Sequence, residues 1–105
     1  IKKGLDDVAA GRYTIIDNFR IAETETFKKK IQSPKYSFLS KKIKEYVYPL
    51  LRENPYFGPN TKRLKGTYKE VYRFRIGDYR LFYTISEELV IIFILDIENR
   101  KDAYR

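Results

Sequence analysis

The sequence predicts an α+β domain, in which a small, mostly antiparallel sheet carries two N-terminal helices packed on one face. Three observations lead to this prediction: helical periodicity between residues 24 and 53, alternating strand-type runs from residue 70 onward, and a tight turn signal between two of those runs. The 105 residues fit one hydrophobic core. Nothing in the composition indicates a second core.

Residues 1–18 form an appendage to the domain, which we expect to span residues 19–105. Within the appendage, residues 3–10 predict a short helix that ends at Gly11, and residues 13–16 predict a short strand. The positive and negative charges of the appendage cancel. Residue 1 is not Met, so we do not expect it to be the native start.

Two helices are predicted after a short strand at residues 19–22. Thr24 has the chemistry of an N-cap for the first helix, and the Ser33-Pro34 step ends it. The second helix covers residues 37–53 and has an apolar stripe opposite a lysine-rich side. Pro49 lies inside this pattern and has no backbone N–H, so we expect a kink or a restart just before it.

The sheet is predicted mainly from the second half of the chain. Residues 70–76 alternate, which directs Val71, Arg73 and Arg75 to one face and Tyr72, Phe74 and Ile76 to the other. A Gly77-Asp78 hairpin turn then leads into a return strand at residues 79–85. Residues 89–97 are apolar at almost every position, which is typical of a central strand covered on both faces.

The amino-acid composition favours some classes of partner and excludes several kinds of site chemistry. The net charge of +8 and the pI of about 9.6 favour a polyanionic partner or an acidic protein. The sequence has no Cys and no His, so it lacks disulfides, thiolate chemistry and the commonest metal ligand, and we expect no metal site and no cofactor. Without a secretory signature or a membrane-length apolar run, we expect a cytoplasmic protein without a membrane partner.

Cations concentrate between residues 62 and 83. The set comprises Lys62, Arg63, Lys65, Lys69, Arg73, Arg75 and Arg80. Guanidinium groups held on a sheet suit phosphate binding, because each presents a planar fork of donors with a permanent charge. The alternatives are a solvated sheet face or, for Arg80, an ion pair with Glu70 or Asp78 across the hairpin.

Four blocks in this order, NPYFGPNTKRLKG, YRFRIGDYRLFY, VIIFILDI and NRKDAYR, resemble the toxins of the RelE/ParE superfamily. The resemblance covers roughly residues 19–105 and is closest to RelE-like mRNA interferases of toxin-antitoxin systems. It implies a RelE/ParE-like fold and an endoribonuclease that cuts messenger RNA in the ribosomal A site, by attack of a 2′-hydroxyl on the neighbouring phosphate. It also implies a cognate antitoxin as partner, with operator DNA bound only through the antitoxin complex.

The resemblance also implies which residues act. Its catalytic positions fall on Arg73, Arg75, Arg80, Asn99, Arg100 and Tyr104, and its RNA-binding positions on Lys62, Arg63, Lys65 and Lys69. Position 99 departs from the family pattern, because relatives carry a histidine where this chain has Asn99. Asparagine cannot act as a general base. The chain is therefore expected to be a weakened toxin, a natural variant, or a protein altered so that its host survives.

Other functions stay open at this point. One is a ParE-type poison of DNA gyrase, and another is a catalytically weakened protein that binds only antitoxin and DNA. The appendage resembles the C-terminal region of small antitoxins, with Asp6 and Asp7 expected near Arg73 to Arg80, or it is a vector-derived remnant.

Overall fold

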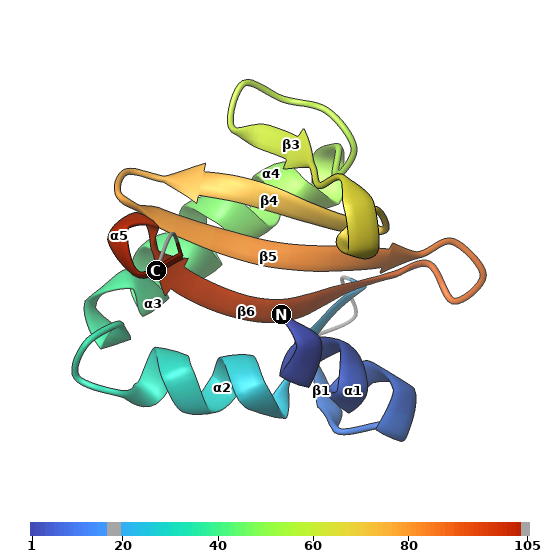
Figure 1. The fold of residues 1–105 in the computed structure, drawn as a ribbon, viewed down its shortest axis with the longest axis horizontal. Helices are drawn as coiled ribbons and strands as arrows, with labels where there is room; N and C mark the ends of the chain where they lie inside the picture. The colour runs from blue at the N-terminus through green and yellow to red at the C-terminus, as the bar shows by residue number, and fades with distance from the viewer. Residues whose placement is uncertain (17–19, 104–105) are drawn as a thin grey trace.

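The computed structural model describes residues 1–16 and 20–103 and shows a single sheet with helices on both faces (Figure 1). The sheet has six strands in the order β1-β2-β6-β5-β4-β3. Their bounds are β1 (Tyr13–Ile16), β2 (Ile21–Thr24), β3 (Thr61–Arg63), β4 (Val71–Ile76), β5 (Tyr79–Ser86) and β6 (Ile91–Asn99). β2 and β6 run parallel, and the other neighbouring strands run antiparallel. The predicted α+β class is confirmed, with a mixed sheet.

The strand β6 lies at the centre of the sheet, between β2 and β5. Its residues from Ile92 to Ile97 are buried, so the predicted cover on both faces is confirmed. Its predicted start was wrong, because Leu89 and Val90 belong to the turn and are 57% and 49% exposed. The Ser86 hydroxyl accepts a hydrogen bond from the backbone N–H of Leu89 at 3.1 Å, and Val90 adopts a left-handed φ of 57°. This turn chemistry overrides the apolar character of both residues.

One face of the sheet is covered by a helical layer. It comprises α2 (Glu25–Gln32), a 3-10 turn (Ser37–Leu39), α3 (Ser40–Lys42), a π-helical segment (Ile43–Val47) and α4 (Tyr48–Glu53). Phe27, Ile43, Val47 and Leu51 bury their side chains there against strand residues such as Ile94. No helix within residues 1–16 and 20–103 is both long enough and apolar enough to cross a membrane.

Local chemistry sets the ends of these helices as the sequence predicted. The Thr24 hydroxyl accepts a hydrogen bond from the Phe27 N–H at 3.3 Å, and α2 ends at Gln32, before Ser33 and Pro34. Because Pro49 has no N–H to continue the hydrogen-bond ladder, a π-helical segment precedes it and α4 restarts at Tyr48. The predicted restart before Pro49 is confirmed.

The opposite face, which we call the front face, carries α1 (Lys2–Ala10) (Figure 1). The prediction of two N-terminal helices packed on one face holds only in part. α2 and the helical segments within residues 37–53 do cover one face, but α1 precedes them and packs on the front face, so the restriction of helices to one face was wrong. Its apolar side, formed by Ile1, Leu5 and Val8, packs against Ala22, Phe82, Phe93 and Leu95. A side chain at Gly4 would meet the Leu95 carbonyl oxygen at 2.3 Å, so α1 lies directly on β6.

The segment 1–16 is attached at two further points. β1 pairs with β2, and one Asp7 oxygen accepts a hydrogen bond from the Thr26 N–H at 2.8 Å, at the start of α2. The other oxygen accepts one from Arg12 Nε at 2.8 Å. Burial raises the pKa of Asp7, but these hydrogen bonds outweigh it, so the pKa is lowered. The expectation that Asp7 approaches Arg73 to Arg80 was wrong, because this carboxylate is held at α2.

Candidate functional site

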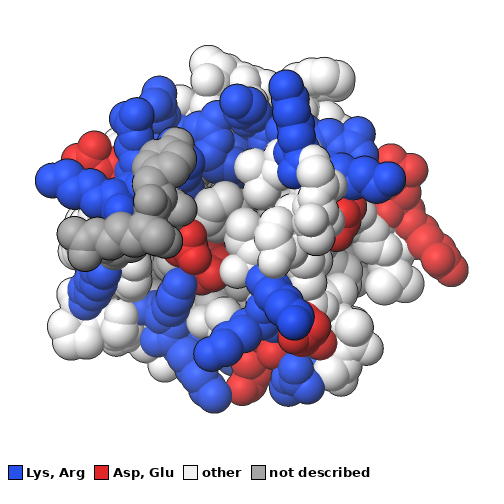
Figure 2. All heavy atoms as spheres, in the orientation of Figure 1, with Lys and Arg blue, Asp and Glu red and all other residues white. Residues whose placement is uncertain are grey.

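Strand register brings four cations together on the front face. Arg75 of β4 lies opposite Arg80 of β5, and Lys62 of β3 lies opposite Arg73 of β4. Directly opposed residues of an antiparallel pair share a face, as do residues two apart on one strand. We call Lys62, Arg73, Arg75 and Arg80 the basic row. Figure 2 shows Lys and Arg side chains gathered on this face, over β3 to β5.

The alternation within β4 holds the basic row in place. Phe74 and Ile76 are buried on the helical side of the sheet, and Tyr72 packs against the same core. Arg73 and Arg75 therefore point to the front, as the sequence predicted. Arg73 and Arg80 are half-buried and Arg75 is exposed. The cations thus stand on strands whose other side is packed into the core.

The other predicted RNA-binding residues lie at the edge of the sheet. Arg63 lies opposite Tyr72, so its side chain leaves β3 on the side away from the basic row. Its Nε donates a hydrogen bond to the Lys69 carbonyl oxygen, and its guanidinium carbon lies 5.9 Å from the centre of the Tyr72 ring. Lys65 and Lys69 are exposed in the connection between β3 and β4. Of this predicted set, only Lys62 belongs to the basic row.

The end of β6 approaches the hairpin turn that joins β4 and β5. The Arg100 N–H donates a hydrogen bond to the Asp78 carbonyl oxygen at 2.7 Å, which places the start of α5 (Arg100–Ala103) beside the turn. Arg100 is exposed. The register therefore brings the backbone of Arg100 close to the strand end that carries Arg75 and Arg80.

Asn99 occupies a different position from the basic row. It lies opposite Tyr79, whose ring contacts Tyr36 and Phe38 on the helical side of the sheet. Its side-chain oxygen accepts a hydrogen bond from the Lys101 N–H at 2.9 Å, which caps α5. In the described chain this side chain thus caps α5, and its catalytic role stays a prediction. Tyr104, the remaining predicted site residue, lies outside the described residues.

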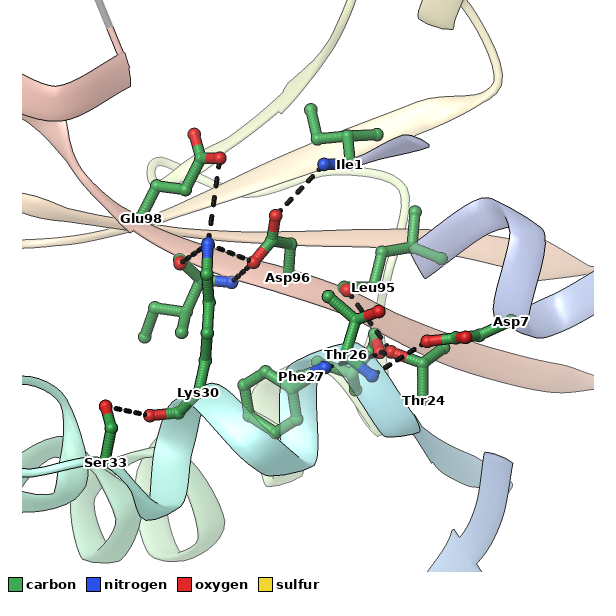
Figure 3. Close-up of polar contacts among 12 residues, drawn as sticks. Ile1, Asp7, Thr24, Thr26, Phe27, Lys30, Ser33, Leu95, Asp96 and Glu98 are labelled. Carbon is green, nitrogen blue, oxygen red and sulfur yellow. Dashed lines mark hydrogen bonds and ion pairs between the residues drawn. The ribbon is translucent and has the colours of Figure 1, made fainter. Parts of the chain in front are cut away.

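Figure 3 shows an ionic network around Asp96 of β6 that the sequence analysis missed. Strand register places it next to the basic row, because Glu98 lies opposite Arg80. Asp96 is 3% exposed, and its carboxylate binds Lys30 Nζ at 2.8 Å and the amino group of Ile1 at 3.0 Å. The same carboxylate accepts a hydrogen bond from the Ile97 N–H at 2.8 Å. These contacts compensate the buried charge and connect α1, α2 and β6.

Glu98 extends this network toward the basic row. It lies opposite Arg80, so it belongs to the front face, and its side chain is 28% exposed. Burial raises the pKa of Glu98, the neighbouring Asp96 carboxylate raises it further, and Lys30, at 3.9 Å, opposes both. The signal in the sequence was the pair of acids two residues apart that ends the apolar run of β6.

Three hollows among the described residues are lined mostly by residues outside the basic row. One of about 220 Å³ reaches it at Arg75, between Lys42 and Asn60. A larger one, of about 440 Å³, is lined by Arg20, Arg52 and other residues at the far end of the sheet. An extended anion on the basic row would therefore lie across the sheet surface. The described residues include no group of three or more carboxylates able to hold a metal ion.

Comparison with known proteins identifies the family. A family model described as the ParE toxin of the type II toxin-antitoxin system parDE matches residues 21–104. The chain belongs to the RelE/ParE superfamily of toxins. This confirms the resemblance seen in the sequence. Residues 1–20 of this RelE/ParE toxin lie outside the family match.

Individual relatives agree with this assignment. A Methanocaldococcus jannaschii protein described as "Putative toxin RelE1" is 42% identical over 67 residues, which cover 62% of this chain and 72% of the relative. The RelBE2 toxin-antitoxin complex of Mycobacterium tuberculosis contains a chain with a TM-score of 0.61 and 25% identity, covering 76% of this toxin and 95% of that chain.

A third relative comes from the RelB-RelE antitoxin-toxin complex of Methanococcus jannaschii. Its TM-score is 0.59 and its identity 25%, over 78% of this toxin and 93% of that chain. The RelE/ParE-like fold is thus confirmed, and about a quarter of this toxin has no counterpart in these solved chains.

Proposed function

We propose that this toxin is a ribosome-dependent endoribonuclease that cleaves messenger RNA in the cytoplasm. The observation that carries the proposal is the basic row, in which Arg75 and Arg80 are paired across two strands with the backbone of Arg100 at the same end. A phosphodiester under attack gains negative charge, and fixed guanidinium groups stabilise that charge. The similarity to RelE toxins agrees with the RelE-like activity that the sequence resemblance implies.

The proposed reaction assigns roles to most of these cations. The 2′-oxygen of one nucleotide attacks the neighbouring phosphorus, and the P–O5′ bond breaks, which leaves a 2′,3′-cyclic phosphate and a 5′-hydroxyl. Arg80 and Arg100 stabilise the charge of the pentacoordinate phosphate. Arg73 and Lys62, farther along the basic row, hold the adjoining phosphate. We also propose that the exposed Arg63, Lys65 and Lys69 contact RNA or ribosome beyond the cleavage site.

Two substitutions test this function. Arg80→Ala and Arg100→Ala should each reduce cleavage of a translated message roughly 100-fold, the usual scale for losing one charge-stabilising donor. Primer extension on the message gives the positions of the cuts, which should follow the codon phase. Lys41→Ala, an exposed cation on α3, is the matched control and should cleave normally. Cleavage by Arg80→Ala at the normal rate and positions would refute the assignment.

A second candidate is a poison of DNA gyrase, which the match to the ParE toxin model favours. The same expression experiment separates the two functions. Gyrase-dependent DNA breaks with an intact message would support the poison, whereas codon-phased cuts with intact DNA would support the ribonuclease.

We further propose a cognate antitoxin as partner, because both solved relatives were obtained as toxin-antitoxin complexes. Operator DNA would then be bound through the antitoxin. Copurification of this toxin with the product of the adjacent gene is the direct test.

A further inference from the structure

The proposed cleavage needs a group that takes the proton of the attacking 2′-hydroxyl, and the arginines of the basic row do not supply one. Arginine keeps its proton in proteins, and the sequence contains no histidine. Asn99 has no basic atom, and it caps α5. A carboxylate is the group of this kind that is ordinarily deprotonated at neutral pH, so the carboxylates beside the basic row are the candidates.

Two carboxylates of β6 lie beside the basic row, and they differ in availability. Asp96 is almost fully buried and is held by Lys30, the Ile1 amino group and the Ile97 N–H. Glu98 is partly exposed, and its distance to Lys30 Nζ is 3.9 Å, too long for a hydrogen bond. The side chain of Glu98 also contacts Asp96, but it is 28% exposed, so a substrate hydroxyl can reach its carboxylate more readily than that of Asp96.

The position of Glu98 suits contact with a bound phosphodiester. Register places Arg75, Arg80 and Glu98 in one line across β4, β5 and β6 on the front face. Directly opposed residues have Cβ atoms about 5 Å apart. A phosphate held by Arg80 would thus have this carboxylate on one side and the cations of the basic row on the other.

We propose that Glu98 is the general base of this toxin; the inference rests on the proposed ribonuclease function. Its carboxylate accepts the 2′-hydroxyl proton while the O2′–P bond forms. The P–O5′ bond breaks with its electron pair on O5′, which takes a proton from water. The protonated Glu98 then returns its proton to solvent, so no proton is gained or lost overall.

The groups around Glu98 determine how the rate of RNA cleavage should depend on pH. Glu98 faces Asp96 of its own strand, Lys30 of α2, the amino group of Ile1 and, across the sheet, Arg80 of β5. Burial and Asp96 raise its pKa, against the influence of Lys30 and the amino group. A base works only when deprotonated, so cleavage should fall as the pH drops through this raised pKa.

The test measures single-turnover cleavage of a ribosome-bound message by the full chain as a function of pH. Glu98→Gln should lower the rate roughly 100-fold and remove the acid limb of the profile, since general base catalysis contributes about that much. Glu98→Asp should retain the acid limb at a reduced rate. Glu88→Gln, an exposed acid of the β5–β6 turn, loses the same charge far from the basic row and should match the unaltered chain.

The outcomes separate this inference from the proposed function. Cleavage by Glu98→Gln at a rate close to normal, with the acid limb intact, would overturn the role of Glu98 alone. Absence of cleavage by the unaltered chain would overturn the ribonuclease function itself. Circular dichroism on each variant checks the fold. A carbon NMR titration of the Glu98 carboxyl group must give the same pKa as the acid limb of the pH profile of cleavage.

Discussion

Tyr83 shows how one buried hydroxyl links stability to pH. Its ring is buried in the core, and its hydroxyl donates a hydrogen bond to the Pro55 carbonyl oxygen at 2.6 Å. Burial, with a smaller contribution from Tyr72, raises the pKa of Tyr83 from 10.0 to about 12. The protonated phenol is favoured in the folded state, so its stabilisation is complete below pH 10 and is lost as the pH rises toward 12.

We therefore expect the free energy of unfolding to fall more steeply between pH 10 and 12 in the unaltered chain than in Tyr83→Phe. The extra loss should be about 2 kcal/mol, since one pKa unit corresponds to about 1.4 kcal/mol. Urea unfolding at fixed pH values measures it. The two proteins differ only at position 83, so all other groups contribute equally to both pH curves. If the free energy of unfolding falls equally in both between pH 10 and 12, Tyr83 has no such role.

At the residue level, the sequence correctly predicted the direction of a side chain where that direction depends only on its own strand. The alternation of β4 correctly predicted Arg73 and Arg75 on one face, because period 2 is a property of the strand itself. Glu98 was missed because its neighbours Arg80 and Lys30 come from distant segments. A bulge between Phe82 and Tyr83 also shifts the register of β6, and sequence alone does not locate it.

Among the elements, α1 depends on the absence of a side chain at Gly4. In an exposed helix, Gly→Ala stabilises by up to about 1 kcal/mol. Here the new Cβ would lie 2.3 Å from the Leu95 carbonyl oxygen, so α1 must move away from β6. We expect Gly4→Ala to lower the melting temperature. Ala9→Val, an exposed change in the same helix, should have a much smaller effect, and a higher melting temperature for Gly4→Ala would contradict the close packing.

We also propose that segment 1–16 restrains the activity of the toxin, because α1 lies on the same face as the basic row and begins beside Asp96. Gly4→Val, which displaces α1, and deletion of residues 1–18 should then both increase cleavage of a translated message. Hydrogen exchange of residues 1–16 in Gly4→Val shows whether the segment has detached. Detachment without any rise in cleavage would remove this role.

The elements themselves were largely predictable, but their packing was not. The helix at 3–10, the Thr24 cap and the restart before Pro49 follow from local chemistry. Whether α1 covers the front face or the helical side depends on its fit against β6. Gly4 permits this fit, but its contact with Leu95, far along the chain, does not follow from the sequence of the segment alone.

For the whole molecule, gathering the cations on one face predicts a salt-dependent affinity for RNA. Each phosphate contact to a single strand contributes about 0.7 to the slope of log affinity against log salt. Arg73→Gln combined with Arg75→Gln should therefore reduce this slope by about 1.4. Fluorescence anisotropy with 2′-O-methyl RNA, which lacks the attacking hydroxyl, measures binding without cleavage.

The matched control changes the same charge elsewhere. Lys41→Gln combined with Lys44→Gln removes two exposed cations from the helical side. The slope should then stay the same. An equal decrease for both pairs would mean that RNA responds to net charge and not to the basic row.

The central place of β6 has a consequence for synthesis. It is the last strand in chain order among the described elements, yet both hydrophobic clusters contain its residues, and Ile92 pairs with Ile21 from the first third of the chain. A nascent polypeptide therefore cannot close either core until residues 91–99 have left the exit tunnel. Until then, the apolar side chains of the earlier segments stay exposed to solvent.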